Sequence, residues 1–124
     1  MYMKKLIVAN SGRDELFNVR LESLEDFVDL PFNLNDEDVQ YEIAEWAIDR
    51  LFNYLNSNKQ NKKKGLEFWP DDIKCSSKRI SFKVMEGLNN YIGTFESDLN
   101  FYDGPSESYD DVEYLIDTAL KDFI

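Results

Sequence analysis

Asp71, Asp72 and Lys74 form the short element of this sequence that comes nearest to an active site. Two carboxylates and a lysine, joined by further carboxylates such as Glu67 or Glu96, can hold Mg²⁺ and position a phosphodiester for cleavage. The element is short and made of common residues, and a solvated loop after a strand accounts for it better. A nuclease also needs a basic groove with aromatic residues for base stacking, and the lysine run before this element contains none. A metal-dependent phosphodiesterase is therefore an alternative and not the leading hypothesis.

Several residue types that catalysis commonly uses are missing. The sequence has no histidine, which excludes Ser-His-Asp and Cys-His sites and removes the commonest general base near neutral pH. Its one cysteine, Cys75, has no partner for an internal disulfide. The glycines in the segment 87–93 lack the lysine and hydroxyl of a phosphate-binding loop. Residues 98–109 begin like an EF-hand loop but end in tyrosine where calcium needs a glutamate. We therefore expect no cofactor and no metal site.

A stripe of carboxylates is the more informative pattern. Where we expect a helix over residues 36–56, Asp38, Glu42, Glu45 and Asp49 fall within about 60° of arc opposite the apolar positions and span about 16 Å of the axis. No lysine interrupts them. Because like charges four residues apart destabilise a helix by about 0.2–0.5 kcal/mol per pair, stability alone does not favour this arrangement. It indicates a binding surface, although acidic faces also keep small proteins soluble.

Other acidic and aromatic residues extend this candidate partner-binding surface. Asp110, Glu113 and Asp117 lie away from the apolar stripe of an expected C-terminal helix. Glu96 and Asp98 occupy the polar face of an expected hairpin. Tyrosine and tryptophan are enriched at the centres of interfaces. The aromatic candidates near the acids are Tyr41, Trp46, Trp69, Tyr102 and Tyr109. Partial burial at the edge of the core is the alternative role for each, and only Tyr102 is included in the predicted binding surface.

The charge of the chain narrows the choice of partner. Its 124 residues carry 25 acidic and 14 basic side chains, a net charge of −11. Residues 14–58 hold 12 acids against two arginines, whereas residues 59–83 hold eight bases against three acids. Nucleic acid and anionic membranes repel such a chain over most of its surface, so the expected partner is a basic protein. No apolar run is long enough for a signal peptide or a membrane span, and we expect a cytoplasmic protein.

The spacing of the carboxylates suggests how such a partner is bound. Carboxylates about 5–6 Å apart along a helix approach the repeat of backbone phosphates and can engage the lysines and arginines that grip DNA or RNA. In charge, size and class the chain resembles phage and plasmid inhibitors of restriction or CRISPR nucleases. The resemblance implies a non-enzymatic protein that occupies the DNA- or RNA-binding surface of a basic protein. The chain equally resembles immunity proteins that neutralise nuclease toxins, and a structural or adaptor subunit is a further alternative.

The elements that position these residues are also predicted. Asn35 is the expected N-cap of the long helix, and Ser108 with Asp111 resembles a capping box at the start of the C-terminal helix. Tyr91 and Phe95 are expected to share the buried face of the last strand. In chain order the predicted elements are a hairpin over 4–10 and 16–22, a short helix from Ser23 that Pro31 ends, the helix over 36–56, an exposed loop over 57–65 that includes the basic run Lys59 to Lys64, a strand over 66–69 that Pro70 ends, a hairpin with strands over 78–86 and 91–101, and a helix from Ser108 onward.

This order of elements predicts the fold class. Neighbouring strands joined by hairpin-length links, with helices between and after them, favour an antiparallel sheet with helices on one face. We therefore expect a single acidic α+β domain over residues 1–124. Its small sheet of two hairpins should be packed on one face by a long central helix and a C-terminal helix.

Overall fold

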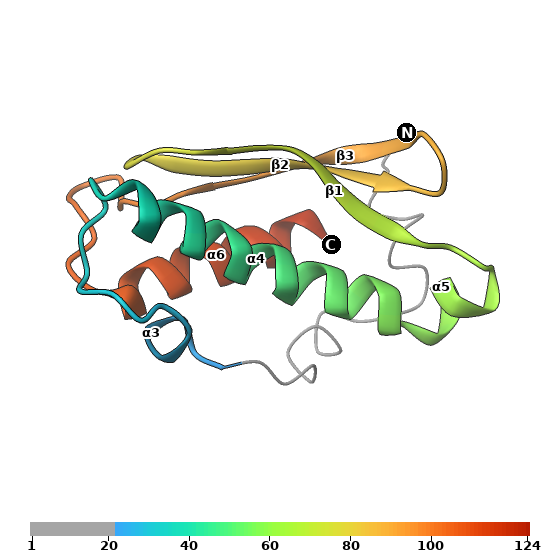
Figure 1. Ribbon diagram of the computed structural model, residues 1–124, viewed down its shortest axis with the longest axis horizontal. Helices are drawn as coiled ribbons and strands as arrows, with labels where there is room; N and C mark the ends of the chain where they lie inside the picture. The colour runs from blue at the N-terminus through green and yellow to red at the C-terminus, as the bar shows by residue number, and fades with distance from the viewer. Residues whose placement is uncertain (1–21) are drawn as a thin grey trace.

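Three antiparallel strands and four helices make up residues 22–124, the part of the chain that the computed structural model describes (Figure 1). The strands are β1 (Phe68–Cys75), β2 (Arg79–Glu86) and β3 (Asn90–Asp98), in the order β1-β2-β3. The helices are α3 (Leu24–Phe27), α4 (Glu37–Ser57), α5 (Lys59–Lys63) and α6 (Tyr109–Phe123). Helix α4 packs against β1 and β2 and helix α6 against β3, so both long helices lie on one face of the sheet.

The predicted α+β class is therefore confirmed, with an antiparallel sheet, a long helix and a C-terminal helix. The second predicted hairpin is the β2–β3 pair. The first, over residues 4–10 and 16–22, lies outside the described residues except for its last position, Glu22. Within the described part, two tight connections link the three strands into one meander.

Helix α4 begins one residue later than the sequence predicted. Asp36, and not Asn35, is its N-cap, and the Asp36 carboxylate accepts a hydrogen bond from the backbone N–H of Asp38 at 2.9 Å. The preceding turn is the cause, because the backbone N–H of Asp36 donates to the carbonyl of Asn33 and keeps Asn35 outside the helix. The apolar side of α4, which recurs at steps of three and four residues, is buried as predicted.

Helix α6 has the predicted start. The Ser108 hydroxyl accepts a hydrogen bond from the backbone N–H of Asp111, and the Asp111 carboxylate accepts one from the backbone N–H of Glu107 at 2.8 Å. These bonds fix where the helix begins. Its apolar stripe then faces the core through Val112, Ile116 and Leu120.

The pairing of β2 with β3 shows how a bulge changes which side chains are buried. Strand β2 buries alternate residues as predicted. Tyr91 was expected on the buried face of β3 but is half exposed. The register between β2 and β3 shifts between Val84 and Met85, so that Ile92 becomes an extra, inward-facing residue and Tyr91 turns to the solvent.

Strand β1 does not end at Pro70 as predicted. Pro70 is aligned with Val84 of β2 and is tolerated because β1 is an edge strand of the described sheet, where an outward position needs no N–H donor. The segment predicted to be a loop after this strand therefore lies within it. The register shifts between Asp71 and Lys74, and Asp72 adopts a positive φ of 51° at this bulge.

The polar stretch after α4 is not the exposed loop that its composition predicted. Asn58 ends α4 and begins α5, and its side chain accepts a hydrogen bond from the backbone N–H of Asn61 at 3.1 Å. The buried Asn61 side chain donates to the carbonyl of Leu55 at 3.0 Å, and the N–H of Leu66 donates to the carbonyl of Asn61. Buried asparagines thus hold the segment in place, a role that a hydrophobicity pattern does not reveal. The lysines of α5 and the adjoining Lys64 are exposed.

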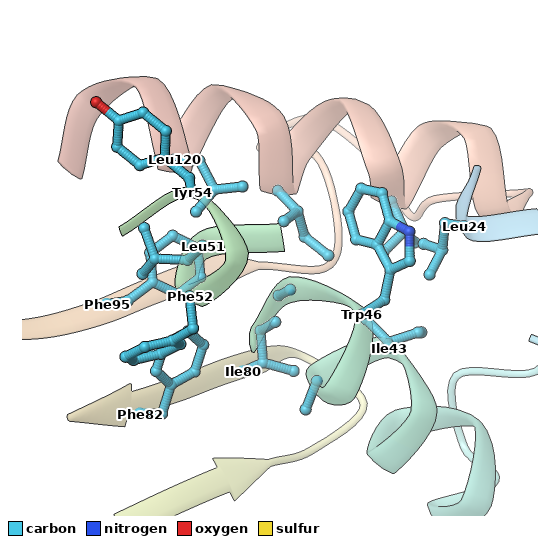
Figure 2. Close-up of a cluster of buried hydrophobic side chains, with 14 of the residues drawn as sticks. Leu24, Ile43, Trp46, Leu51, Phe52, Tyr54, Ile80, Phe82, Phe95 and Leu120 are labelled. Atoms are coloured by element: carbon cyan, nitrogen blue, oxygen red, sulfur yellow. The ribbon is translucent and has the colours of Figure 1, made fainter. Parts of the chain in front are cut away.

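Aromatic rings fill the space between the sheet and the long helices (Figure 2). The ring centroid of Phe82 on β2 lies 5.9 Å from that of Phe52 on α4 and 5.1 Å from that of Phe95 on β3. Such contacts between large buried side chains dominate the energetics of a core of this size. They fix the rotation of α4 on the sheet and so decide which of its residues face the solvent.

Candidate functional site

The four carboxylates predicted to share one side of α4 do so, and we refer to Asp38, Glu42, Glu45 and Asp49 as the acidic stripe. Asp38 and Asp49 are exposed, and Glu42 and Glu45 are half-buried. Within residues 22–124 none of the four forms an ion pair with a lysine or arginine. An exposed aromatic residue, Tyr41, lies beside them, and its hydrogen bond to the Glu45 carboxylate raises the pKa of the Tyr41 hydroxyl. The acidic stripe is thus an uncompensated row of negative charge with a phenol at its edge.

The acidic stripe carries an electrostatic cost. Partial burial raises the pKa of Asp49, and repulsion from Glu45, four residues earlier, raises it further. Because the pKa of Asp49 is higher in the folded chain than in the unfolded chain, ionisation of this group weakens folding. Stability is therefore lost as the pH rises from below the unfolded pKa through the raised folded one. At neutral pH the ionised Asp49 carboxylate opposes folding, as expected of a charge kept for binding or solubility.

Replacing Asp49 by asparagine is expected to stabilise the chain slightly at pH 7, by a few tenths of a kcal/mol, because it removes the repulsion with Glu45. At about pH 3 the Asp49 carboxyl, whose pKa is raised, is largely protonated, and the substitution should have no such effect. Thermal unfolding followed by circular dichroism at the two pH values measures this difference. Asp103→Asn, in an exposed turn, is the matched control. A clear loss of stability in Asp49→Asn at pH 7 would contradict the expectation.

The tertiary structure adds carboxylates that the sequence analysis missed. Tyr109, at the start of α6, is buried, and that burial raises its pKa, with further contributions from Glu42 and Asp36. The first turns of α4 therefore lie beside the first turn of α6. Glu25 of α3 is exposed in the same region. Because these residues come from distant segments, no local pattern in the sequence signals that they meet.

Two of the predicted binding residues on α6 are engaged within the fold. Asp117 Oδ1 lies 2.9 Å from Arg50 Nε, and the two side chains are only 22% and 11% exposed. Burial raises the pKa of Asp117, while Arg50 opposes that change. Glu113 Oε1 accepts a hydrogen bond from the backbone N–H of Leu24 at 2.6 Å. These two residues thus face α4 and α3 instead of pointing away from the core as expected, and of the three predicted on α6 only Asp110 is exposed.

Glu96 and Asp98 are exposed on the face of the sheet opposite the helices. They alternate along β3 with the buried residues that face α6, which confirms the predicted polar face. Arg79 of β2 lies across from them, with its guanidinium nitrogens 3.8 Å from the Glu96 carboxylate and 3.1 Å from that of Asp98. They are therefore partly neutralised and cannot share one flat surface with the acidic stripe. Tyr102, in the turn after β3, is fully exposed.

The aromatic candidates divide between core and surface. Trp46 is 1% exposed, its indole N–H donates to the carbonyl of Glu22 at 2.8 Å, and the Arg50 guanidinium carbon lies 5.4 Å from its ring centroid. The interpretation of Trp46 as an interface residue or a partly buried edge residue is therefore wrong. It lies in the core beside Leu24 (Figure 2). Of the five aromatic candidates Trp46 and Tyr109 are buried, whereas Tyr41, Trp69 and Tyr102 keep exposed surface.

The element with potential catalytic groups forms ion pairs between strands. Asp72 Oδ2 lies 3.7 Å from Lys74 Nζ and 3.5 Å from Lys83 Nζ. Asp71 is aligned with Lys83 across the sheet. Two ammonium groups beside Asp72 occupy the space that a cation would need. In residues 22–124 no group of three or more acidic or cysteine side chains is arranged to hold a metal ion.

Comparisons with known proteins add no family to this geometry. No family model, curated protein or solved structure matches the chain. None of the helices in the described part has both the length and the apolar composition that crossing a membrane requires. The surface of the described residues is therefore the guide to function.

Proposed function

We propose that this chain is a non-enzymatic binding protein that inhibits a basic, nucleic-acid-handling protein by occupying its DNA- or RNA-binding surface. The observation that carries the proposal is the acidic stripe on α4, whose four carboxylates are exposed or half-buried and have no cationic partner among the described residues. Lysines and arginines that bind backbone phosphates recognise such a row of carboxylates through the same charge-assisted contacts.

The distribution of charge over the fold supports the proposal. Residues 22–57 hold ten carboxylates and one base, Arg50, whose side chain is turned inward to Asp117. The bases of the second half lie on other elements than α4: on α5 and its C-cap, on β1, β2 and the turn between them, and, for Lys121, in the last turn of α6. A surface of one sign attracts a partner of the opposite sign and accelerates its association.

Solubility alone is the simplest competing explanation of the acidic stripe. A face that serves only solubility is insensitive to where its charges sit, whereas a face that mimics phosphates depends on their positions. The Tyr41 ring at its edge is exposed, and aromatic residues of this kind serve as contact points in interfaces. The two explanations therefore differ in an experiment that moves charge without changing its total.

The test compares two triple variants of equal charge. Asp38→Lys/Glu45→Lys/Asp49→Lys reverses the acidic stripe but spares Glu42, which lies near the buried Tyr109. Glu67→Lys/Asp71→Lys/Asp103→Lys reverses three exposed carboxylates elsewhere. The immobilised wild-type chain first retains basic proteins from a lysate at low salt, and a retained nucleic-acid-binding protein is identified and purified. Its affinity for each variant, and its displacement by duplex DNA, are then measured by calorimetry.

The stripe variant is expected to bind this protein at least about tenfold more weakly, a difference of about 1.4 kcal/mol. The control variant should bind like the wild-type chain, raised salt should weaken the complex, and duplex DNA should compete with it. Equal affinities for the two variants, or a complex that forms on DNA without competition, would refute the proposal. An immunity protein for a nuclease toxin is the alternative within this class, and a retained nuclease encoded beside this chain would favour it.

A further inference from the structure

A groove lies between α3 and the start of α6. Its volume is about 350 Å³, at the small end of the roughly 300–1,000 Å³ of ligand pockets, so it has room for one long side chain. Its lining combines apolar side chains with two exposed carboxylates. The residues that matter here are Val28, Leu30, Phe32 and Tyr109, with Glu25 and Glu107.

The apolar part of the groove is held in place by internal contacts. The Tyr109 hydroxyl donates a hydrogen bond to the carbonyl of Leu30 at 2.9 Å. The Phe32 ring meets the Tyr109 ring edge to face, with centroids 5.0 Å apart. Val28 is 4% exposed and packs into the core behind them. The groove is therefore formed before any ligand arrives, which lowers the entropic cost of binding.

The electrostatics around the groove favour a cation. Glu25 and Glu107 line it, and Asp36 and Glu42 are close enough to raise the pKa of the Tyr109 hydroxyl beyond the effect of its burial. The start of α6 would by itself attract an anion. In that first turn, however, the backbone N–H of Asp111 donates to the Ser108 hydroxyl, and the Asp111 carboxylate, which accepts from the N–H of Glu107 just before the helix, adds negative charge. The local potential is thus set by carboxylates from α3, α4 and the segment before α6.

We infer that this groove binds the side chain of an arginine presented by the basic protein partner. A planar guanidinium can stack on the half-buried Phe32 ring, which stands edge to face with the buried Tyr109 ring, and donate to carboxylates at the two sides, whereas a lysine ammonium is more strongly hydrated and has no planar face. Glu42 of the acidic stripe does not line the groove, but its charge contributes to raising the pKa of the Tyr109 hydroxyl, so the stripe and the groove lie within electrostatic reach of each other. The inference rests on the proposed function for its partner and goes beyond it by naming the residue that is recognised.

The test uses short peptides on the intact chain. Acetyl-Gly-Arg-Gly-amide is titrated into the isotopically labelled protein, and amide chemical shifts are followed by NMR, with lysine and citrulline peptides as comparisons. The arginine peptide should shift the amides of Glu25, Glu107 and Tyr109 before those of the acidic stripe. It should bind more tightly than the lysine peptide, and the uncharged citrulline peptide should not bind.

Two double variants test which carboxylates bind the arginine peptide. Glu25→Gln/Glu107→Gln is expected to weaken the arginine peptide by about fivefold, since each exposed charge pair contributes modestly. Glu67→Gln/Asp103→Asn, with the same change in net charge, should have no effect. Shifts spread evenly over all carboxylates, equal binding of the arginine and lysine peptides, or equal weakening in both variants would overturn the inference. The peptide titration needs no partner protein, so it is independent of the test of the proposed function. If the peptide did not bind in the groove while the partner complex depended on the acidic stripe, only the arginine site would be rejected. If the peptide bound in the groove while the partner bound the stripe variant as tightly as the control variant, only the proposed function would be rejected.

Discussion

Replacing Trp46 by alanine is expected to lower the free energy of unfolding by about 3–5 kcal/mol. The side chain projects from α4 toward Leu24 and α6 and is fully buried (Figure 2). Its removal therefore leaves a cavity and also loses the transfer free energy of a large aromatic ring. It also removes the donor to the Glu22 carbonyl and the ring beneath the Arg50 guanidinium. Because domains of this size are stable by about 5–15 kcal/mol, the variant should unfold at much lower urea concentration.

Trp69 provides a matched control for Trp46. Its indole N–H also donates to a backbone carbonyl, that of Gly87 at 2.7 Å, but the side chain is 36% exposed at the edge of the sheet. Trp46→Phe should therefore cost about 1–2 kcal/mol, and Trp69→Phe less than about 1 kcal/mol, in urea unfolding followed by circular dichroism. If the two substitutions had equal effects, or if Trp46→Ala were as stable as the wild-type chain, the placement of Trp46 in the core would be contradicted.

Replacing Arg50 by methionine is expected to destabilise the chain by about 2 kcal/mol at pH 7. This is less than the cost of breaking a fully buried ion pair, because the Asp117 side chain keeps some exposure to solvent. The substitution preserves the packing of the stem on Trp46 but leaves the Asp117 carboxylate between α4 and α6 without its arginine. Burial already raises the pKa of Asp117 while Arg50 lowers it, so the variant should raise that pKa further. Urea unfolding of both proteins at several pH values measures the difference.

The destabilisation by Arg50→Met is expected to depend on pH in a definite direction. A raised folded pKa means that stability falls as the pH rises through it, because the unfolded chain ionises more easily. The difference between wild-type and Arg50→Met should thus be largest at neutral pH and shrink below about pH 3, where Asp117 is largely protonated in both the folded and the unfolded chain. Asp117→Asn, which leaves the more deeply buried Arg50 guanidinium without its carboxylate, should also destabilise the chain. A loss that is independent of pH would show that the arginine acts through packing alone.

The sequence predicted a helix or strand correctly where its position and its buried face depend only on its own residues. Apolar spacing in α4 and α6, the Ser108 cap and the alternation in β2 are local patterns, and the structure agrees with each. The errors arose where another segment decides the outcome. Pro70 is accommodated because β1 is an edge strand, Tyr91 is exposed because of a bulge opposite Val84, and Asn61 is buried by hydrogen bonds to residues of other turns.

The candidate site follows the same division. That Asp38, Glu42, Glu45 and Asp49 share one side of a helix is a consequence of 3.6-residue periodicity and could be derived from the sequence. Whether a carboxylate on another element is free to bind a partner could not be derived from the sequence. It depends on which lysine or arginine the fold brings near enough to form a salt bridge. Arg50 reaches Asp117 across the α4–α6 contact, and Arg79 reaches Asp98 across the sheet.

By itself, then, the sequence determined the class of fold, the long acidic helix and the excess of negative charge, since these depend on composition and on spacing along one element. Only the tertiary structure decided that Trp46 is a core residue, that Asp117 is compensated, and that Glu25 and Glu107 meet at one groove beside Tyr109. The physical reason is that burial and charge pairing depend on distances between segments, and packing of α3, α4 and α6 against one another sets those distances.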